Sequence, residues 1–182
     1  ADDHGFPMIN LGVSAGAIYV IRNPLDVVIS FSHFRGVPID QAIIDMATAG
    51  FGLPTDHCLV SFAMDSWSAH VRSWTERPSP AVHVVRYEDM LAEPNPAFGA
   101  IAHHVLMAPT PEQLSRAIAV VSFDRLKKAE TDGGFHDTPA AAEPFFREGR
   151  AGQWRQVLSA KQVERIAADH GDQMGRFGYL PD

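Results

Sequence analysis

The sequence predicts an α/β fold in which a parallel sheet is flanked by helices in three layers. Two short β-rich apolar segments, AIYVI at 17–21 and AVHVVRY at 81–87, are separated by sequence with helical spacing. Strands that alternate with helices are typical of parallel sheets, whose ligands bind beyond the carboxyl ends of the strands. Arg22 and Tyr87 lie at these two ends. We therefore expect the functional site beside them.

The first strand leads directly into a predicted helix. Asn23 and Pro24 follow the strand, and Asn is a good N-cap while Pro is favoured at the first helical position. The spacing predicts a helix over about 24–34 that ends near Gly36.

A second, amphipathic helix is predicted over 59–75. Pro78 and Pro80 follow it as a stop. Its apolar positions recur at helical spacing and are Leu59, Phe62, Ala63, Trp67, Val71 and Trp74. We expect the last three to pack in the core, and we expect the neighbouring His70 to be structural.

Further helices are predicted after the second strand, over about 88–92, 96–106 and 111–121. A Gly-, Pro- and Ala-rich loop is expected from about 131 to 144. Ser159 and Gln162 form a capping-box pattern that opens a closing helix, and Gly178 ends it. The buried stripe of that helix is Val163, Ile166, Ala167, His170, Met174 and Phe177.

Composition indicates one domain over residues 1–182. With 46% hydrophobic residues the chain can bury a core, and its net charge of −7 argues against general adhesion to nucleic acid or anionic membranes. No apolar run approaches the roughly 18 residues of a membrane helix. Cys58 is the single cysteine, which favours a reducing compartment, and we expect the cytoplasm.

The segment YVIRNPLDVVISFSHF carries the strongest chemical signal. Arg22 combines its charge with the unpaired N–H groups of a helix N-terminus, which suits an anion. Ser30 lies on the same helical face as Asp26 and adds a hydroxyl. The alternative is that Arg22 pairs with Asp26 and that Ser30 only packs.

This segment resembles the 3′-phosphate-binding motif of sulfotransferases that use 3′-phosphoadenosine 5′-phosphosulfate (PAPS). The matching residues are Tyr19, Arg22, Asn23, Pro24, Asp26, Ser30 and Phe34. The resemblance continues in order through SWSAHVRSW at 66–74, VRYEDML at 85–91, SFDRLKKAE at 122–130 and FFREGRAGQW at 145–154. It implies a P-loop NTPase-like fold, PAPS as cosubstrate and a small-molecule acceptor with a hydroxyl or amine group.

The resemblance also implies a two-sided phosphate clamp. Arg22 and Ser30 are expected to bind the 3′-phosphate, and Arg147 and Gly149 are expected to hold it from a late loop. The forked donors of arginine and the close backbone approach at glycine suit this role. The alternative for Arg147 is an exposed, solvated charge.

Tyr87 and Phe123 match family positions that contact adenine, although each is also suited to the core. Acceptor contacts are expected from the segment 36–57. Its candidate lining residues, which alternatively only pack, are Ile39, Ile43, Met46, Phe51 and Leu53.

Two departures from the family pattern affect these expectations. Glu148 stands where many relatives carry Lys, and we expect it to face water because a close acid would oppose phosphate binding. The tail reads SAKQVE where cytosolic animal enzymes carry a dimerisation signature. An oligomer is possible, but that particular dimer is not expected.

The sequence contains no GxxxxGK[ST] loop for a 5′-phosphosulfate. We therefore expect the domain to be N-terminally incomplete, with the phosphosulfate loop and the general-base His upstream of Ala1. His4 is a weak candidate for that base because it lacks the Lys-Thr context of the family. No catalytic residue is assigned.

Other functions remain as alternatives. His103-His104 and His57-Cys58 lack zinc-ligand spacing, so no metal is expected. No GxSxG motif is present to suggest a serine hydrolase. A non-catalytic nucleotide-binding module of the same fold and a nucleotide kinase remain open.

Overall fold

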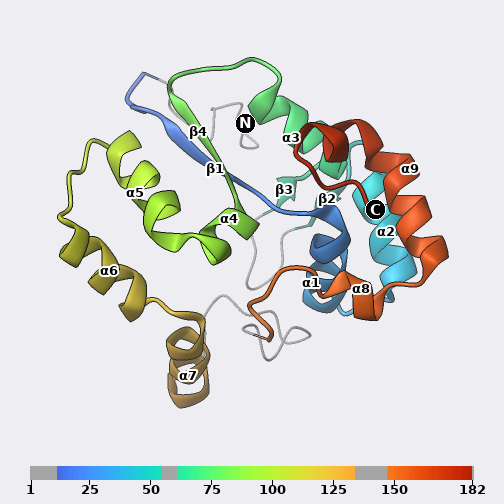
Figure 1. The fold of residues 1–182 in the computed structure, drawn as a ribbon. Coiled ribbons are helices and arrows are strands. Elements are labelled where there is room, and N and C mark those ends of the chain that lie inside the picture. Colours follow the sequence, from blue (N-terminus) through green and yellow to red (C-terminus); the bar gives the residue numbers. More distant parts are fainter. Residues whose placement is uncertain (1–11, 55–60, 134–146, 182) are drawn as a thin grey trace.

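The computed structural model describes residues 12–54, 61–133 and 147–181. Its centre is a parallel pair of strands, β1 (Ala17–Ile21) and β4 (Val82–Arg86), with Tyr19 opposite Val84 (Figure 1). Both predicted strands and their parallel arrangement are confirmed. A short antiparallel pair, β2 (Gly52–Leu53) with β3 (Phe62–Ala63), lies apart from this sheet.

Helix α1 (Pro24–Arg35) follows β1 as predicted. The Asn23 side chain accepts a hydrogen bond from the Leu25 amide at 3.0 Å, which satisfies one of the free N–H groups of the first turn. At the other end Gly36 has φ 64°, a left-handed conformation in which its amide donates to the Ser32 and His33 carbonyls. The predicted start and stop of this helix are confirmed.

The predicted helix over 59–75 begins later than expected. Helix α3 (Trp67–Thr75) opens at Ser66, whose hydroxyl accepts from the Ala69 amide at 3.2 Å. Asp65 has φ 59°, so the chain turns immediately before the helix, and the preceding residues form β3. Leu59 lies outside the described residues. Val71 is fully buried, and the two tryptophans of the helix pack against the core as predicted.

Three helices were missed from the sequence, α2, α7 and the short α8. Helix α2 (Ile39–Ala47) lies in the segment expected to contact the acceptor, and α7 (Phe123–Gly133) includes the first residues of the expected loop at 131–144. The rest of that loop lies outside the described residues from 134 onward. In α2, Ala42, Ile43 and Met46 are buried at helical spacing, a pattern that indicates a helix and was overlooked.

Four other helices have ends within two residues of the predicted ones: α4 (Tyr87–Ala92), α5 (Pro94–His104), α6 (Pro111–Val120) and α9 (Ala160–Arg176). The short helix α8 (Trp154–Val157) was not predicted. The capping box at Ser159 and Gln162 is present, and Gly178 follows α9 with φ 69°. Ile166, His170 and Met174 of the predicted stripe are buried.

The core lies on one side of the parallel sheet. Residues of β1, α1, α2, α3 and α9 form it, and those at most 1% exposed include Ile21, Leu25, Val28, Val71, Ile166 and Met174. Helices α5, α6 and α7 follow one another on the other side (Figure 1), and the structure shows no buried residue in them. Within the described ranges, none of the helices is long and apolar enough to cross a membrane.

Candidate functional site

A cavity of about 530 Å³ lies at the carboxyl ends of β1 and β4. It is bordered by α1, the start of α4, the start of α7 and the segment 147–153. All six residues predicted from the sequence line it: Arg22, Ser30, Tyr87, Phe123, Arg147 and Gly149. The structure therefore brings together residues that are up to 127 positions apart, although the ligand roles assigned to them remain predictions.

Arg22 follows β1 and lies against the aromatic ring of Tyr87. Its Cζ is 4.4 Å from the ring centroid, its Nη1 donates to Ser30 Oγ at 3.4 Å, and its Nη2 donates to the Arg150 carbonyl at 3.2 Å. Arg22 Nε is buried and has no hydrogen-bond partner within the described chain. A buried unpaired donor costs about 1–3 kcal/mol. The two Nη atoms, whose hydrogen bonds are exposed, are the groups of this guanidinium that a ligand can reach.

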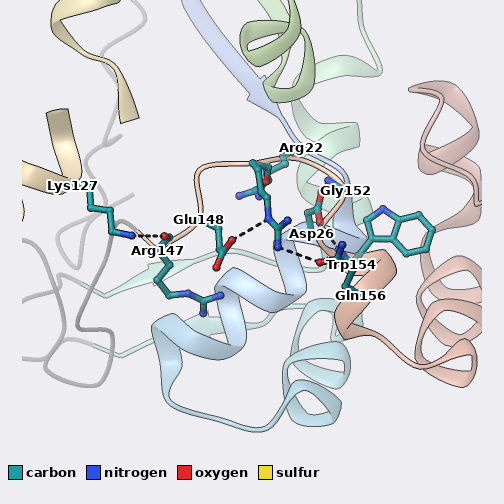
Figure 2. A network of polar contacts seen from close by, with 9 residues as sticks. Arg22, Asp26, Lys127, Arg147, Glu148, Gly152, Trp154 and Gln156 are labelled. Atoms are coloured by element: carbon teal, nitrogen blue, oxygen red, sulfur yellow. Dashed lines mark hydrogen bonds and ion pairs between the residues drawn. The ribbon is translucent and has the colours of Figure 1, made fainter. Parts of the chain in front are cut away.

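Asp26 does not pair with Arg22, which was the alternative considered from the sequence. Asp26 is 1% exposed, and its two carboxylate oxygens accept from the Gly152 amide at 2.6 Å and the Trp154 amide at 3.0 Å. Figure 2 shows both contacts, which join α1 to the late segment of the cavity wall. Asp26 was missed as a residue of the site, although an acid on the otherwise apolar face of α1 was a signal that buried N–H partners were needed.

Gly149 contacts the ring of Phe123 directly. It has φ 60°, and a Cβ added to it would lie 2.2 Å from Phe123 Cδ2. Both its left-handed backbone and the close ring require glycine at this position. Because Phe123 is the first residue of α7, this contact fixes the late segment against that helix. Lys127 of the same helix donates to the Arg147 carbonyl at 3.1 Å.

Glu148 faces water, as predicted. Its side chain is 48% exposed, and its Oε2 lies 3.0 Å from Arg150 Nε. Arg150 also donates to Gln156 Oε1 at 3.3 Å. The basic partner two residues along therefore offsets the acid that replaces a family lysine, although Glu148 still borders the cavity.

Glu88 is a further residue that sequence reasoning missed. One of its carboxylate oxygens accepts from the Asn23 amide at 3.0 Å and the other from the Tyr179 hydroxyl at 2.8 Å. These contacts hold the β1–α1 turn against α4, which carries Tyr87. Burial is the main reason that the pKa of Tyr179 is raised, and the hydrogen bond to Glu88 adds to the effect.

A second cavity of about 300 Å³ shares Arg22, Val27 and Phe31 with the first. Tyr19 and His70 line it, with the hydroxyl 3.0 Å from His70 Nδ1. Burial raises the pKa of Tyr19 to about 12 and lowers the pKa of His70.

Of the residues expected to contact the acceptor, Met46 and Phe51 also line this second cavity. Ile43 and Leu53 are buried, and Ile39 packs against the core.

Metal ligation is not evident from the described part of the chain, where no three His, Cys, Asp or Glu side chains are grouped to hold an ion. His4, His57 and Cys58 lie outside the described residues.

A family model described as the sulfotransferase domain matches residues 7–178 of the chain. Flavonol 3-sulfotransferase of Flaveria bidentis is 23% identical, with 90% of this chain and 56% of that protein covered. Cytosolic sulfotransferase 15 of Arabidopsis thaliana is 28% identical, with 88% and 47% covered. The chain spans about half the length of the curated relatives it matches, between 47% and 62%.

Solved structures with a similar fold include a sulfotransferase and a retinol dehydratase. Mouse sulfotransferase SULT7A1 complexed with PAP superposes with a TM-score of 0.68 at 21% identity, covering 88% of this chain and 58% of that one. Retinol dehydratase in complex with androsterone and the inactive cofactor PAP gives 0.67 at 22% identity, with 87% and 47% covered. The expected P-loop NTPase-like α/β fold is confirmed by these neighbours.

Proposed function

The chain belongs to the sulfotransferase domain family, and we propose that the protein transfers a sulfuryl group from PAPS to a hydroxyl or amine of a small-molecule acceptor. The observation that carries the proposal is the meeting of Arg22 and Ser30 with Arg147 and Gly149 around one cavity. Two arginines and a glycine backbone around a single space suit a phosphate dianion.

The cavity residues fit the 3′-phosphate of such a cosubstrate. Arg22 lines the cavity, and its Nη1 and Nη2 make exposed hydrogen bonds of 3.4 and 3.2 Å, so these groups can donate to an anion there. Gly149 has no side chain to obstruct approach to its backbone, and Phe123 holds it in place. Tyr87 and Phe123 offer aromatic surface beside the phosphate site, which suits an adenine ring.

In the proposed reaction these residues bind and orient the nucleotide. When bound, PAPS would supply the sulfuryl group: the acceptor oxygen or nitrogen bonds to sulfur, the bond from sulfur to the 5′-phosphate oxygen breaks to release PAP, and the acceptor proton passes to a base. Arg22 and Ser30 hold the 3′-phosphate from the β1–α1 side, and Arg147 and the backbone at Gly149 hold it from the opposite side. This fixes the nucleotide in position relative to the acceptor, which lowers the entropic part of the barrier.

The acceptor is proposed to be a small organic molecule. The relatives include proteins named for flavonols, 3-beta-hydroxysteroids and amines, which share an accessible hydroxyl or amine. We place the reaction in the cytoplasm, because one relative is named a cytosolic sulfotransferase and Cys58 is the single cysteine of the sequence.

Calorimetric titration of the full-length protein tests the proposal. Adenosine 3′,5′-bisphosphate (PAP) is compared with AMP, which lacks the 3′-phosphate, and with ADP in the presence of magnesium. We expect PAP to bind about a hundredfold more tightly than AMP, as two charge-assisted contacts to one phosphate allow. Equal binding of PAP and AMP, or a preference for magnesium-ADP, would contradict the proposal.

A further inference from the structure

We propose that Asp26 is a positioning residue for the phosphate clamp, acting by holding the segment 147–153 in register with Arg22 and Ser30. This inference rests on the proposed function, because it concerns how the 3′-phosphate site is assembled. Asp26 is not among the described residues that line the cavity. Its effect on a nucleotide must therefore pass through the segment that it holds.

The contacts of Asp26 cross 126 and 128 positions of sequence. Oδ2 accepts from the Gly152 amide at 2.6 Å and Oδ1 from the Trp154 amide at 3.0 Å, so each oxygen has its own backbone donor. Gly152 has φ 78°, a left-handed conformation at the turn where the segment enters α8. The carboxylate thus holds both ends of a single turn.

The burial of Asp26 makes these contacts strong. The residue is 1% exposed and lies on α1 among Leu25, Val28 and Ile29, which are 0–5% exposed. A carboxylate removed from water needs hydrogen-bond donors, and hydrogen bonds to an ionised group are stronger than those between neutral groups. Loss of one oxygen would leave a backbone N–H unpaired in a dry environment, and loss of the charge would weaken both hydrogen bonds.

The other contacts that hold this segment lie closer to water. Arg22 donates to the Arg150 carbonyl, Lys127 to the Arg147 carbonyl, and Arg150 pairs with Glu148, all at exposed positions. Such contacts each contribute little because water competes for them. Figure 2 shows how the segment passes across α1 between these contacts and Asp26. The Phe123 ring holds this segment at Gly149, and we assign its position at the other end, at Gly152 and Trp154, to Asp26.

Asp26→Asn in the full-length protein tests this assignment. The substitution keeps the volume but replaces one acceptor oxygen by an NH₂ group that faces a backbone N–H. Asp45→Asn is a matched control, because Asp45 is also buried, at 7% exposed, and its carboxylate binds side chains of α1 and α2, Arg35 and Gln41. The affinities for PAP and AMP are measured at a temperature where all three proteins are folded, as judged by circular dichroism.

The quantity that decides is the ratio of the AMP and PAP dissociation constants. A role in stability alone leaves this ratio unchanged in a folded protein. We expect Asp26→Asn to lower it about tenfold, as the loss of one side of a charged clamp would, while Asp45→Asn leaves it within about twofold. If the ratio in Asp26→Asn is as high as in the wild type, the positioning role is overturned but the proposed function stands. A wild-type ratio near one overturns the proposed function and this inference with it.

Hydrogen exchange in the wild-type protein decides the matter even if Asp26→Asn does not fold. Coupling between two sites is reciprocal, so a ligand that benefits from the Asp26 contacts must also strengthen them. We expect PAP, but not AMP, to slow exchange of the Gly152 and Trp154 amides by about tenfold at saturation. No difference between the two nucleotides, with PAP bound, would overturn the inference.

Discussion

The two halves of the proposed phosphate clamp are built in different ways. Arg22 directly follows β1 and Ser30 lies on α1, and the side chains of Ile21, Leu25 and Val28 in these elements are at most 1% exposed. Arg147 and Gly149 belong to a segment outside any helix or strand, which is held by a buried carboxylate, a phenylalanine ring and exposed hydrogen bonds. The first half is fixed by the core, whereas the second depends on a few contacts.

This difference affects how each half contributes to ligand binding. A cation fixed by the core costs no ordering when the ligand arrives, so its contact contributes fully to binding. A segment held by few contacts is more easily displaced, and its contribution depends on each of them. Substitutions in the two halves should therefore differ in size and in kind.

Arg22→Ala is expected to have the largest effect. It removes the cation that contacts Tyr87 and Ser30 and should weaken PAP binding by about a hundredfold, with AMP affected much less. Arg147→Ala removes the cation of the second half and should cost about tenfold. Titration of both variants with both nucleotides checks the order. An equal loss in the two variants would show that the halves are equally fixed.

Gly149→Ala is expected to displace the second half. The new Cβ would clash with the Phe123 ring, and alanine would be held in an unfavourable left-handed backbone conformation. PAP binding should therefore fall by about tenfold. Gly50→Ala is the matched control, because Gly50 also has positive φ, at 71°, but nothing lies within 4 Å of its added Cβ. It should destabilise the protein by about 1 kcal/mol without changing PAP affinity. Loss of PAP binding in both variants would indicate general unfolding rather than displacement of the segment.

Acidification should weaken the core that supports the first half. His170 is 3% exposed, its Nδ1 lies 2.9 Å from Ser68 Oγ, and burial lowers its pKa below the ordinary 6.5, with Asp169 opposing the shift. Because the unfolded chain then binds the proton more readily, stability from this group is complete above about pH 6.5 and is lost as the pH falls. The loss is at most about 1.4 kcal/mol per pH unit.

Urea unfolding at pH 7.5 and pH 5.5 measures this effect, and His170→Asn removes the titrating ring while keeping a polar group for Ser68. The difference in unfolding free energy between the two pH values should be smaller in the variant than in the wild type. If this difference in unfolding free energy is the same in the variant and the wild type, groups other than His170 cause the acid sensitivity.

Glu148→Gln should have the smallest effect. Glu148 is half-exposed and paired with Arg150, so removing its charge should raise PAP affinity only about twofold, and less at high salt. Titration at low and high ionic strength checks this prediction. A large gain that persists in high salt would mean that Glu148 opposes the phosphate directly.

Local sequence patterns were sufficient for the first half of the site. The strand AIYVI, the cap at Asn23 and the stop at Gly36 act within a few residues of one another, and all are present as predicted. The capping box at Ser159 is of the same kind. Such features are decided by backbone hydrogen bonds that close over three or four positions, so the sequence alone reveals them.

Other features depended on contacts that no local pattern contains. The helix predicted from 59 begins at Trp67 because Asp65 turns the chain and Ser66 caps it, whereas the apolar spacing continued through both. The roles of Asp26 and Glu88 depend on donors 65 to 128 positions away. Periodicity cannot indicate such partners, because it records only which face of an element is apolar.

By itself, then, the sequence determined the order of the strands and most helices, the turn from β1 into α1 that carries Arg22 and, through its resemblance, the family. Only the tertiary structure decided that Arg147 and Gly149 meet Arg22 and Ser30 around one cavity, and that Asp26 binds the turn at Gly152 rather than pairing with Arg22. The physical reason is burial: a carboxylate enclosed by the core must take the donors that folding brings to it, and those donors are distant in sequence.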